Sequence, residues 1–80
     1  HLAFLVDVPI AIDHITLAAA AEGLGTCWIG SFDPAGARTV LGIPENVEVV
    51  ELLALGYPAD PSPVEKSRLP FETVVHWDRW

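Results

Sequence analysis

Basic residues, cysteine and methionine are scarce or missing in this sequence of 80 residues. Four lysines and arginines stand against eleven aspartates and glutamates, which gives a formal net charge of −7. This balance argues against general binding to nucleic acid or to anionic membranes, because both select basic surfaces. A single cysteine, Cys27, excludes an internal disulfide. The default expectation is therefore a cytoplasmic location.

Methionine is absent altogether, and the chain opens on apolar residues without the basic flank of a signal peptide. His1 is therefore not a translation start, and we expect the chain to be part of a longer protein. Acidic residues interrupt the apolar first half before any run reaches about 18 residues, which predicts no membrane span. Residues 1–80 are expected to be the C-terminal portion of a single domain.

The first predicted element is a helix from Val8 to Glu22, with Asp7 as its N-cap, Pro9 in its first turn and Gly23 after its end. Its few polar residues are scattered around the helix rather than gathered on one face. A helix that is apolar on nearly every side must be covered on nearly every side. Eighty residues are too few for this, so we expect another chain or segment to pack on it.

Two strands and a short helix are predicted next. Residues 26–29 are β-branched and aromatic enough for a short buried strand. Asp33 is expected to cap a helix of about eight residues that Gly42 ends. Residues 47–57 (VEVVELLALGY) then favour a strand covered on both faces. The order of these elements indicates an α+β fold with helices layered on a sheet.

The proline-rich segment at residues 57–70 predicts an extended arm of polyproline character, and residues 71–80 a C-terminal strand or tail. Half of the basic residues, Lys66 and Arg68, lie on this arm. Residues i and i+2 of an extended segment point to the same side, so the two cations would converge. Such a pair suits a phosphate group. The alternative on spacing alone is a solvated surface pair, or an ion pair with another chain.

Other patterns in the chain do not predict a site. The glycines at 23, 25 and 30 follow a helix and lead into a strand, the reverse of a dinucleotide-binding loop. The residues around Ser31 do not form a nucleophile elbow, and the three histidines lack the spacing of metal ligands. Cys27 is interpreted as a small apolar residue of a buried strand, since reactive thiols need an electropositive, accessible setting.

Three stretches, taken in order, resemble the C-terminal portion of the FMN-dependent nitroreductase family. They are residues 6–33 (VDVPIAIDHITLAAAAEGLGTCWIGSFD), residues 41–58 (LGIPENVEVVELLALGYP) and residues 65–70 (EKSRLP). The resemblance covers nearly the whole chain. Its most specific feature is the block AAAAEGLGTCWIGSFD together with GYP and KSRLP downstream.

The resemblance implies an α+β homodimer with intertwined subunits, with the apolar helix in the dimer core and the C-terminal segment reaching across to the partner. It also implies a cofactor-binding set. Lys66 and Arg68 would hold the phosphate of FMN. The loop after the first strand would lie beside the flavin ring, with a backbone N–H near flavin N5; this loop maps onto Trp28, Ile29, Gly30 and Ser31.

The chemistry implied by the resemblance belongs to the flavin. NAD(P)H would be the electron donor and a nitroaromatic, a quinone or a related small molecule the acceptor, so no side chain here is predicted to be catalytic. The family's N-terminal Arg-Ser-x-Arg motif is absent from these residues. They therefore hold about half of a flavin site, and we expect this fragment alone to be inactive. The alternative is a flavin-free dimerisation or interaction module that keeps this half of the fold.

Overall fold

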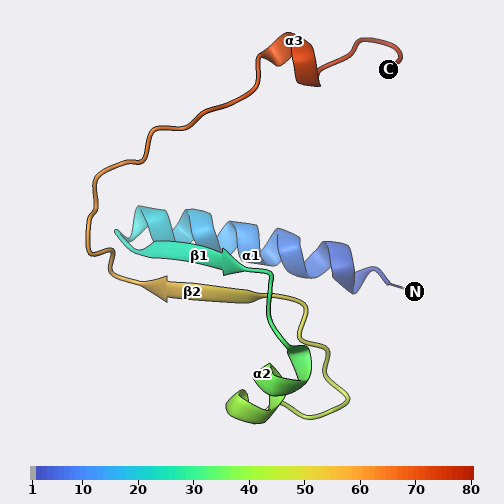
Figure 1. Cartoon of the computed structure of the whole chain (residues 1–80), viewed down its shortest axis with the longest axis vertical. Helices are drawn as coiled ribbons and strands as arrows, with labels where there is room; N and C mark the ends of the chain where they lie inside the picture. Colours follow the sequence, from blue (N-terminus) through green and yellow to red (C-terminus); the bar gives the residue numbers. More distant parts are fainter. Residues whose placement is uncertain (1) are drawn as a thin grey trace.

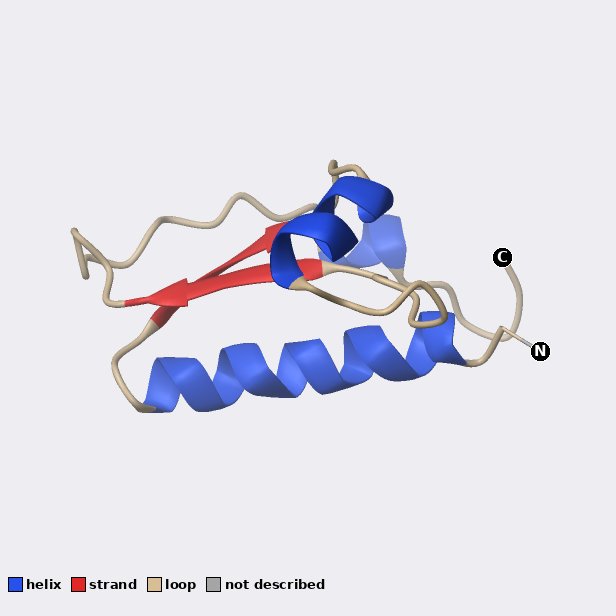
Figure 2. Ribbon diagram, turned by 90° about the horizontal axis from the view of Figure 1, so that it is seen from below, coloured by secondary structure: helices blue, strands red, loops and turns tan. Residues whose placement is uncertain are grey.

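The structure, a computed structural model, describes residues 2–80. Its elements are α1 (Phe4–Ala21), β1 (Gly25–Ile29), α2 (Pro34–Leu41), β2 (Leu52–Gly56) and α3 (Phe71–Val74). β1 and β2 pair antiparallel, with Gly25 opposite Gly56 and Ile29 opposite Leu52. α1 runs along one face of this sheet, and α2 lies beyond the end where β1 finishes and β2 begins (Figures 1 and 2). The predicted α+β class is confirmed.

The N-terminal boundary predicted for the first helix is wrong. α1 begins at Phe4 rather than Val8, so Asp7 lies in its first turn and makes no cap, and Pro9 lies inside the helix. Nothing in the apolar stretch before Asp7 stops a helix, and Pro9 removes a single intrahelical hydrogen bond. At 18 residues α1 is long and apolar enough to cross a membrane, a test that core helices of soluble proteins also pass.

Both predicted helix stops are confirmed. Gly23 has φ 76° and donates to Ala20 O, while Leu24 N donates to Ala19 O, the paired bonds of a Schellman motif. Gly42 has φ 69° and ends α2 in the same left-handed conformation. These two positions need glycine, because other residues adopt that region at a cost.

Asp33 caps α2 as predicted, with Oδ1 accepting from Ala35 N at 3.2 Å. Replacing an N-cap aspartate by alanine costs about 1 kcal/mol of stability. We therefore expect Asp33→Ala in the complete gene product to lower the free energy of unfolding by about that amount. Chemical denaturation measures it. The matched control is Glu65→Ala, which removes an exposed carboxylate of the arm and should leave the free energy of unfolding unchanged.

The second strand is shorter and less covered than predicted. β2 spans Leu52–Gly56 rather than residues 47–57, pairs with β1 and is not doubly covered. Residues 48–51 precede it without regular structure, because a strand exists only where a neighbouring strand offers hydrogen bonds. The prediction that Cys27 is buried is also wrong: it is exposed on the sheet.

Residues 57–70 form an extended arm, and of the two expectations for residues 71–80, a strand or a tail, the structure shows no strand within its described residues. Residues 57–70 are exposed and contain no helix or strand, and Pro70 has the polyproline values φ −57° and ψ 145°. Residues 71–74 form the single helical turn α3, in which Thr73 N donates to Pro70 O. The arm carries this segment away from the sheet (Figure 1), so it has no strand edge to join.

Much of the apolar surface of this chain is uncovered. Ala19 alone among residues 2–80 is buried, and the accessible surface is 7070 Å². A compact monomer of 8.6 kDa would expose roughly 4,700 Å². The radius of gyration is 16.7 Å, against about 12 Å for a compact domain of this length. Leu5, Ile10, Ile15 and Leu17 of α1 are each about half exposed or more. The predicted need for another covering segment is thus visible in the structure.

Candidate cofactor site

The predicted ring-binding loop consists of the last two residues of β1 and the two residues that follow this strand. Trp28 and Ile29 are the last two residues of β1, and Gly30 and Ser31 follow in the turn that leads to α2. All four are exposed. Four consecutive exposed residues, two of them large and apolar, give a surface against which a flat ring can pack.

Gly30 does not have a positive φ, unlike Gly23 and Gly42. Its contribution is therefore the missing side chain rather than an unusual backbone conformation. A β-carbon placed on Gly30 would lie 3.7 Å from Oε1 of Glu51, an ordinary van der Waals contact. Glu51 was not among the residues singled out from the sequence. Only the strand register points to Glu51. When the pairing of Ile29 with Leu52 is extended by one residue, Glu51 falls opposite Gly30.

Lys66 and Arg68 lie on the exposed arm. No hydrogen bond or ion pair within residues 2–80 engages either side chain. Near the start of the arm, Asp60 Oδ1 accepts a hydrogen bond from Ser62 N at 3.0 Å. This backbone hydrogen bond lowers the pKa of Asp60. Two uncommitted cations, two residues apart on an extended segment, are available to an anion.

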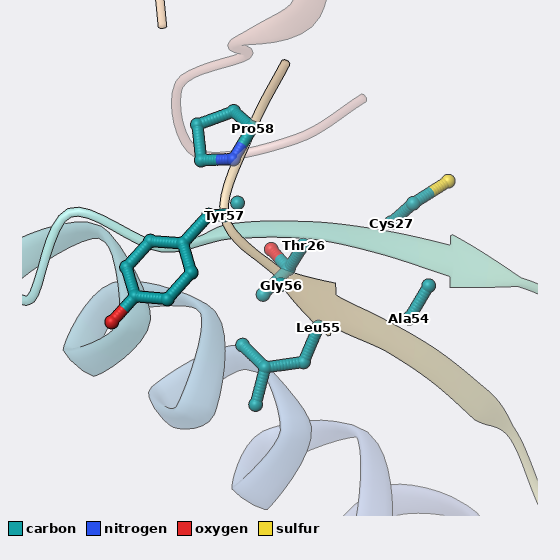
Figure 3. A pocket seen from close by; sticks show the side chains of 8 residues that line it. Thr26, Cys27, Ala54, Leu55, Gly56, Tyr57 and Pro58 are labelled. Atoms are coloured by element: carbon teal, nitrogen blue, oxygen red, sulfur yellow. The ribbon is translucent and has the colours of Figure 1, made fainter.

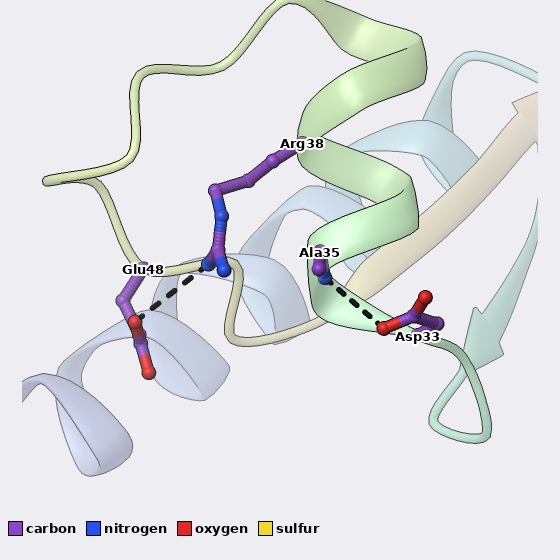
Figure 4. Close-up of polar contacts among 4 residues, drawn as sticks. All are labelled: Asp33, Ala35, Arg38 and Glu48. Carbon is purple, nitrogen blue, oxygen red and sulfur yellow. Dashed lines mark hydrogen bonds and ion pairs between the residues drawn. The ribbon is translucent and has the colours of Figure 1, made fainter.

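Arg38 differs from these two cations because it is engaged. Its Nη1 lies 3.9 Å from Oε2 of Glu48, across the turn between α2 and β2 (Figure 4). The same view shows the Asp33 cap at the start of α2. The exposed Glu48 partner makes this a weak pair. Arg38 thus pairs with Glu48 beside α2, and no sequence pattern predicted it as a cofactor-binding residue.

The structure does not bring the two halves of the predicted site together within one chain. Gly56, from which the arm departs, pairs with Gly25 at the opposite end of β1 from Ile29. The ten residues from Tyr57 to Lys66 can span up to roughly 33 Å when extended. This exceeds the length of the five-residue strand β1, so the arm is long enough to bring its cations to the loop of its own chain.

Two hollows lie on the sheet and beside it. One of about 400 Å³ lies at the root of the arm and is lined by residues 25–27 and 54–58. Figure 3 shows its Cys27 and Ala54 pointing to one side of the sheet and Leu55 to the other. The second, about 430 Å³, is nearly apolar and lies between Phe32, α2 and Leu52. Neither hollow is lined by Lys66 or Arg68, so the candidate cofactor residues lie on the surface and do not line a formed pocket.

Comparison with known proteins gives one consistent family. The family model described as the nitroreductase family matches residues 2–57. A protein named NADH dehydrogenase from Thermus thermophilus is 40% identical over 68 residues, which are 85% of this chain and 33% of that protein. A protein named NADPH-flavin oxidoreductase from Vibrio harveyi is 39% identical over 77 residues, covering 94% of this chain and 32% of that protein.

Solved structures agree with the sequence comparison. A nitroreductase of B. subtilis matches with a TM-score of 0.79 and 35% identity, over 94% of this chain and 31% of that one. A nitroreductase family protein of Clostridium difficile matches with a TM-score of 0.78 and 30% identity, over 95% of this chain and 46% of that one. The chain thus spans between about a third and a half of the length of these proteins.

Proposed function

Because this chain belongs to the nitroreductase family, we propose that it is part of an FMN-dependent oxidoreductase that takes electrons from NAD(P)H. The flavin would supply the hydride chemistry, and the protein would bind and orient it. The observation that supports this proposal is the uncommitted pair Lys66 and Arg68 on an extended, exposed arm. A phosphate is an anion that a guanidinium fork and a neighbouring ammonium bind well.

The chain's own residues would divide the binding of FMN between them. Lys66 and Arg68 would bind the phosphate. The backbone of the loop at Trp28, Ile29, Gly30 and Ser31 would contact the ring, with a loop N–H donating near N5. This assignment uses the exposure of all four loop residues and the absent side chain of Gly30. No side chain of this chain is assigned a catalytic role.

The proposed assembly is a homodimer, and the proposed acceptor is a nitroaromatic, a quinone or a related small molecule. The accessible surface exceeds what a folded monomer leaves exposed, and we propose that a second copy covers part of the apolar surface of α1. The flavin-free interaction module remains the competing function, and the same apolar surface favours it. We propose a cytoplasmic location for either.

Bound flavin distinguishes the two functions. The complete gene product, purified without added cofactor, should be yellow, and denaturation should release FMN that chromatography identifies. Its flavin should bleach when NADH or NADPH is added anaerobically. A colourless protein that stays unable to bind added FMN would leave the interaction module as the function of this chain.

Gly30 provides a test of the ring-binding loop. A valine side chain at Gly30 would enter the space beside the Glu51 carboxylate and force the loop to shift, so Gly30→Val should lose most of the bound FMN. The circular dichroism and oligomeric state should not change, because Gly30 has no positive φ. Gly30→Ala is the matched control: its β-carbon has room at 3.7 Å from Glu51 Oε1, and it should keep more flavin than valine does. If Gly30→Val retains FMN at full occupancy, Gly30 is a turn residue without a role in ring binding.

A further inference from the structure

One carboxylate oxygen is buried beside the proposed ring-binding loop without a hydrogen-bond partner. It is Oε1 of Glu51, the single such side-chain atom found within residues 2–80. A buried polar atom without a partner is rare in native proteins and requires an explanation. Glu51 immediately precedes β2, and its side chain occupies the space next to Gly30, with Oε1 and Oε2 at 3.7 and 4.0 Å from a β-carbon placed there.

The charge of Glu51 is not neutralised by the described part of the chain. The one ion pair found in residues 2–80 joins Arg38 to Glu48. Glu48 is largely exposed, with 68% of its side chain accessible, so solvent screens it. Glu51 is partly buried, and there a charge acts on its neighbours through a lower effective dielectric constant. The electrostatic effect of Glu51 on Gly30 is thus stronger than that of Glu48.

We propose that Glu51 tunes the reduction potential of the flavin by placing a negative charge against the loop that contacts the ring. This inference rests on the proposed function. Hydride transfer from a reduced nicotinamide gives the ring two electrons and one proton and leaves the nicotinamide oxidised. The ring therefore gains one net negative charge. A carboxylate next to Gly30 would repel that charge and weaken the binding of reduced flavin relative to oxidised flavin.

The consequence is a more strongly reducing flavin than the same site would hold without Glu51. A lower potential favours delivery of electrons to poorly oxidising acceptors. Glu51 therefore acts on the flavin through the position of its negative charge. It touches neither substrate nor the reacting atoms and acts through the Gly30 backbone.

The test is the midpoint potential of the flavin in the complete, flavin-loaded protein, measured by anaerobic titration against redox dyes. Glu51→Gln keeps the shape and removes the charge. In Glu51→Gln, the ratio of the affinities for reduced and oxidised flavin should rise roughly tenfold over that of the parent. This corresponds to a rise of about 30 mV in the midpoint potential of a two-electron couple. Glu51→Asp keeps the charge and should restore most of the parent's potential. Glu48→Gln changes the net charge equally and should leave the potential unchanged.

The outcomes separate this inference from the function on which it rests. A parent protein that binds no flavin overturns both. A parent that binds FMN, with Glu51→Gln at the parent's potential, overturns the role of Glu51 alone. Equal shifts in Glu51→Gln and Glu48→Gln would trace the effect to net charge and also overturn it. If Glu51→Gln does not fold, the potential of Glu51→Asp decides: a value far from the parent's contradicts the proposal.

Discussion

Arg68→Ala should weaken FMN binding by about 10- to 150-fold while changing riboflavin binding little. A hydrogen bond to a charged group contributes roughly 1.5–3 kcal/mol, and this range sets the expected factor. Riboflavin has the ring without the phosphate, so it reports the loop alone. Because Arg68 has no partner within residues 2–80, its removal should not disturb the fold of this chain. Titration of the apoprotein with both ligands, followed by flavin fluorescence, measures the two affinities.

Three further variants refine the assignment of the arm. Lys66→Ala should behave like Arg68→Ala. Arg68→Lys should recover only part of the loss, since an ammonium cannot reproduce the planar fork. Added salt should weaken FMN binding more in the parent than in either alanine variant, because the lost interaction is electrostatic. Arg79→Ala, on the exposed C-terminal tail, removes the same charge outside the arm and should leave FMN affinity unchanged.

Equal losses for FMN and riboflavin in Arg68→Ala would contradict the phosphate assignment. That result would show that the two cations support the fold or an interface between subunits. An ion pair with another chain was one of the alternatives that their spacing in the sequence left open.

Isolated as an 80-residue polypeptide, the chain should not persist as a folded monomer. Its accessible surface of 7070 Å² exceeds that of a compact monomer by about 2,400 Å². Burial of one aliphatic side chain contributes about 1.5–3 kcal/mol. Leaving several uncovered on α1 alone offsets a typical stability of roughly 5–15 kcal/mol. The excess surface is of the order that obligate subunit interfaces bury.

Sedimentation velocity at low micromolar concentration measures this directly. A dimer, a larger species or aggregate is expected, with a distribution that shifts with concentration. The complete gene product, run alongside, should sediment as a discrete dimer. A well-dispersed NMR spectrum from a species of monomer mass in the isolated chain would contradict the prediction.

Short-range features of the fold were determined by the sequence itself. Asp33 and Gly42 bound α2, and Gly23 ends α1, because caps and left-handed glycines depend on neighbouring residues only. The polyproline arm follows from proline's fixed φ in the same way. Because α1 is apolar on nearly every side, the sequence also predicted correctly that this chain leaves part of the helix surface uncovered.

Only tertiary structure decided the extent and covering of the strands. Residues 48–51 have the composition of a strand but no partner, and residues 71–74 became a helical turn because no sheet edge lies near them. Cys27 is exposed for a related reason: nothing within residues 2–80 covers its face of the sheet. Local patterns measure what a residue prefers, whereas pairing and burial depend on which segments meet it.

The same division holds for the candidate site. Lys66 and Arg68 could be found from sequence because both lie on one short extended segment, where spacing fixes direction. Glu51 could not, because its proximity to Gly30 arises from the pairing of two strands more than twenty residues apart. The register of β1 against β2 placed a buried carboxylate against the loop, and a one-residue slip would have turned that side chain to the other face of the sheet.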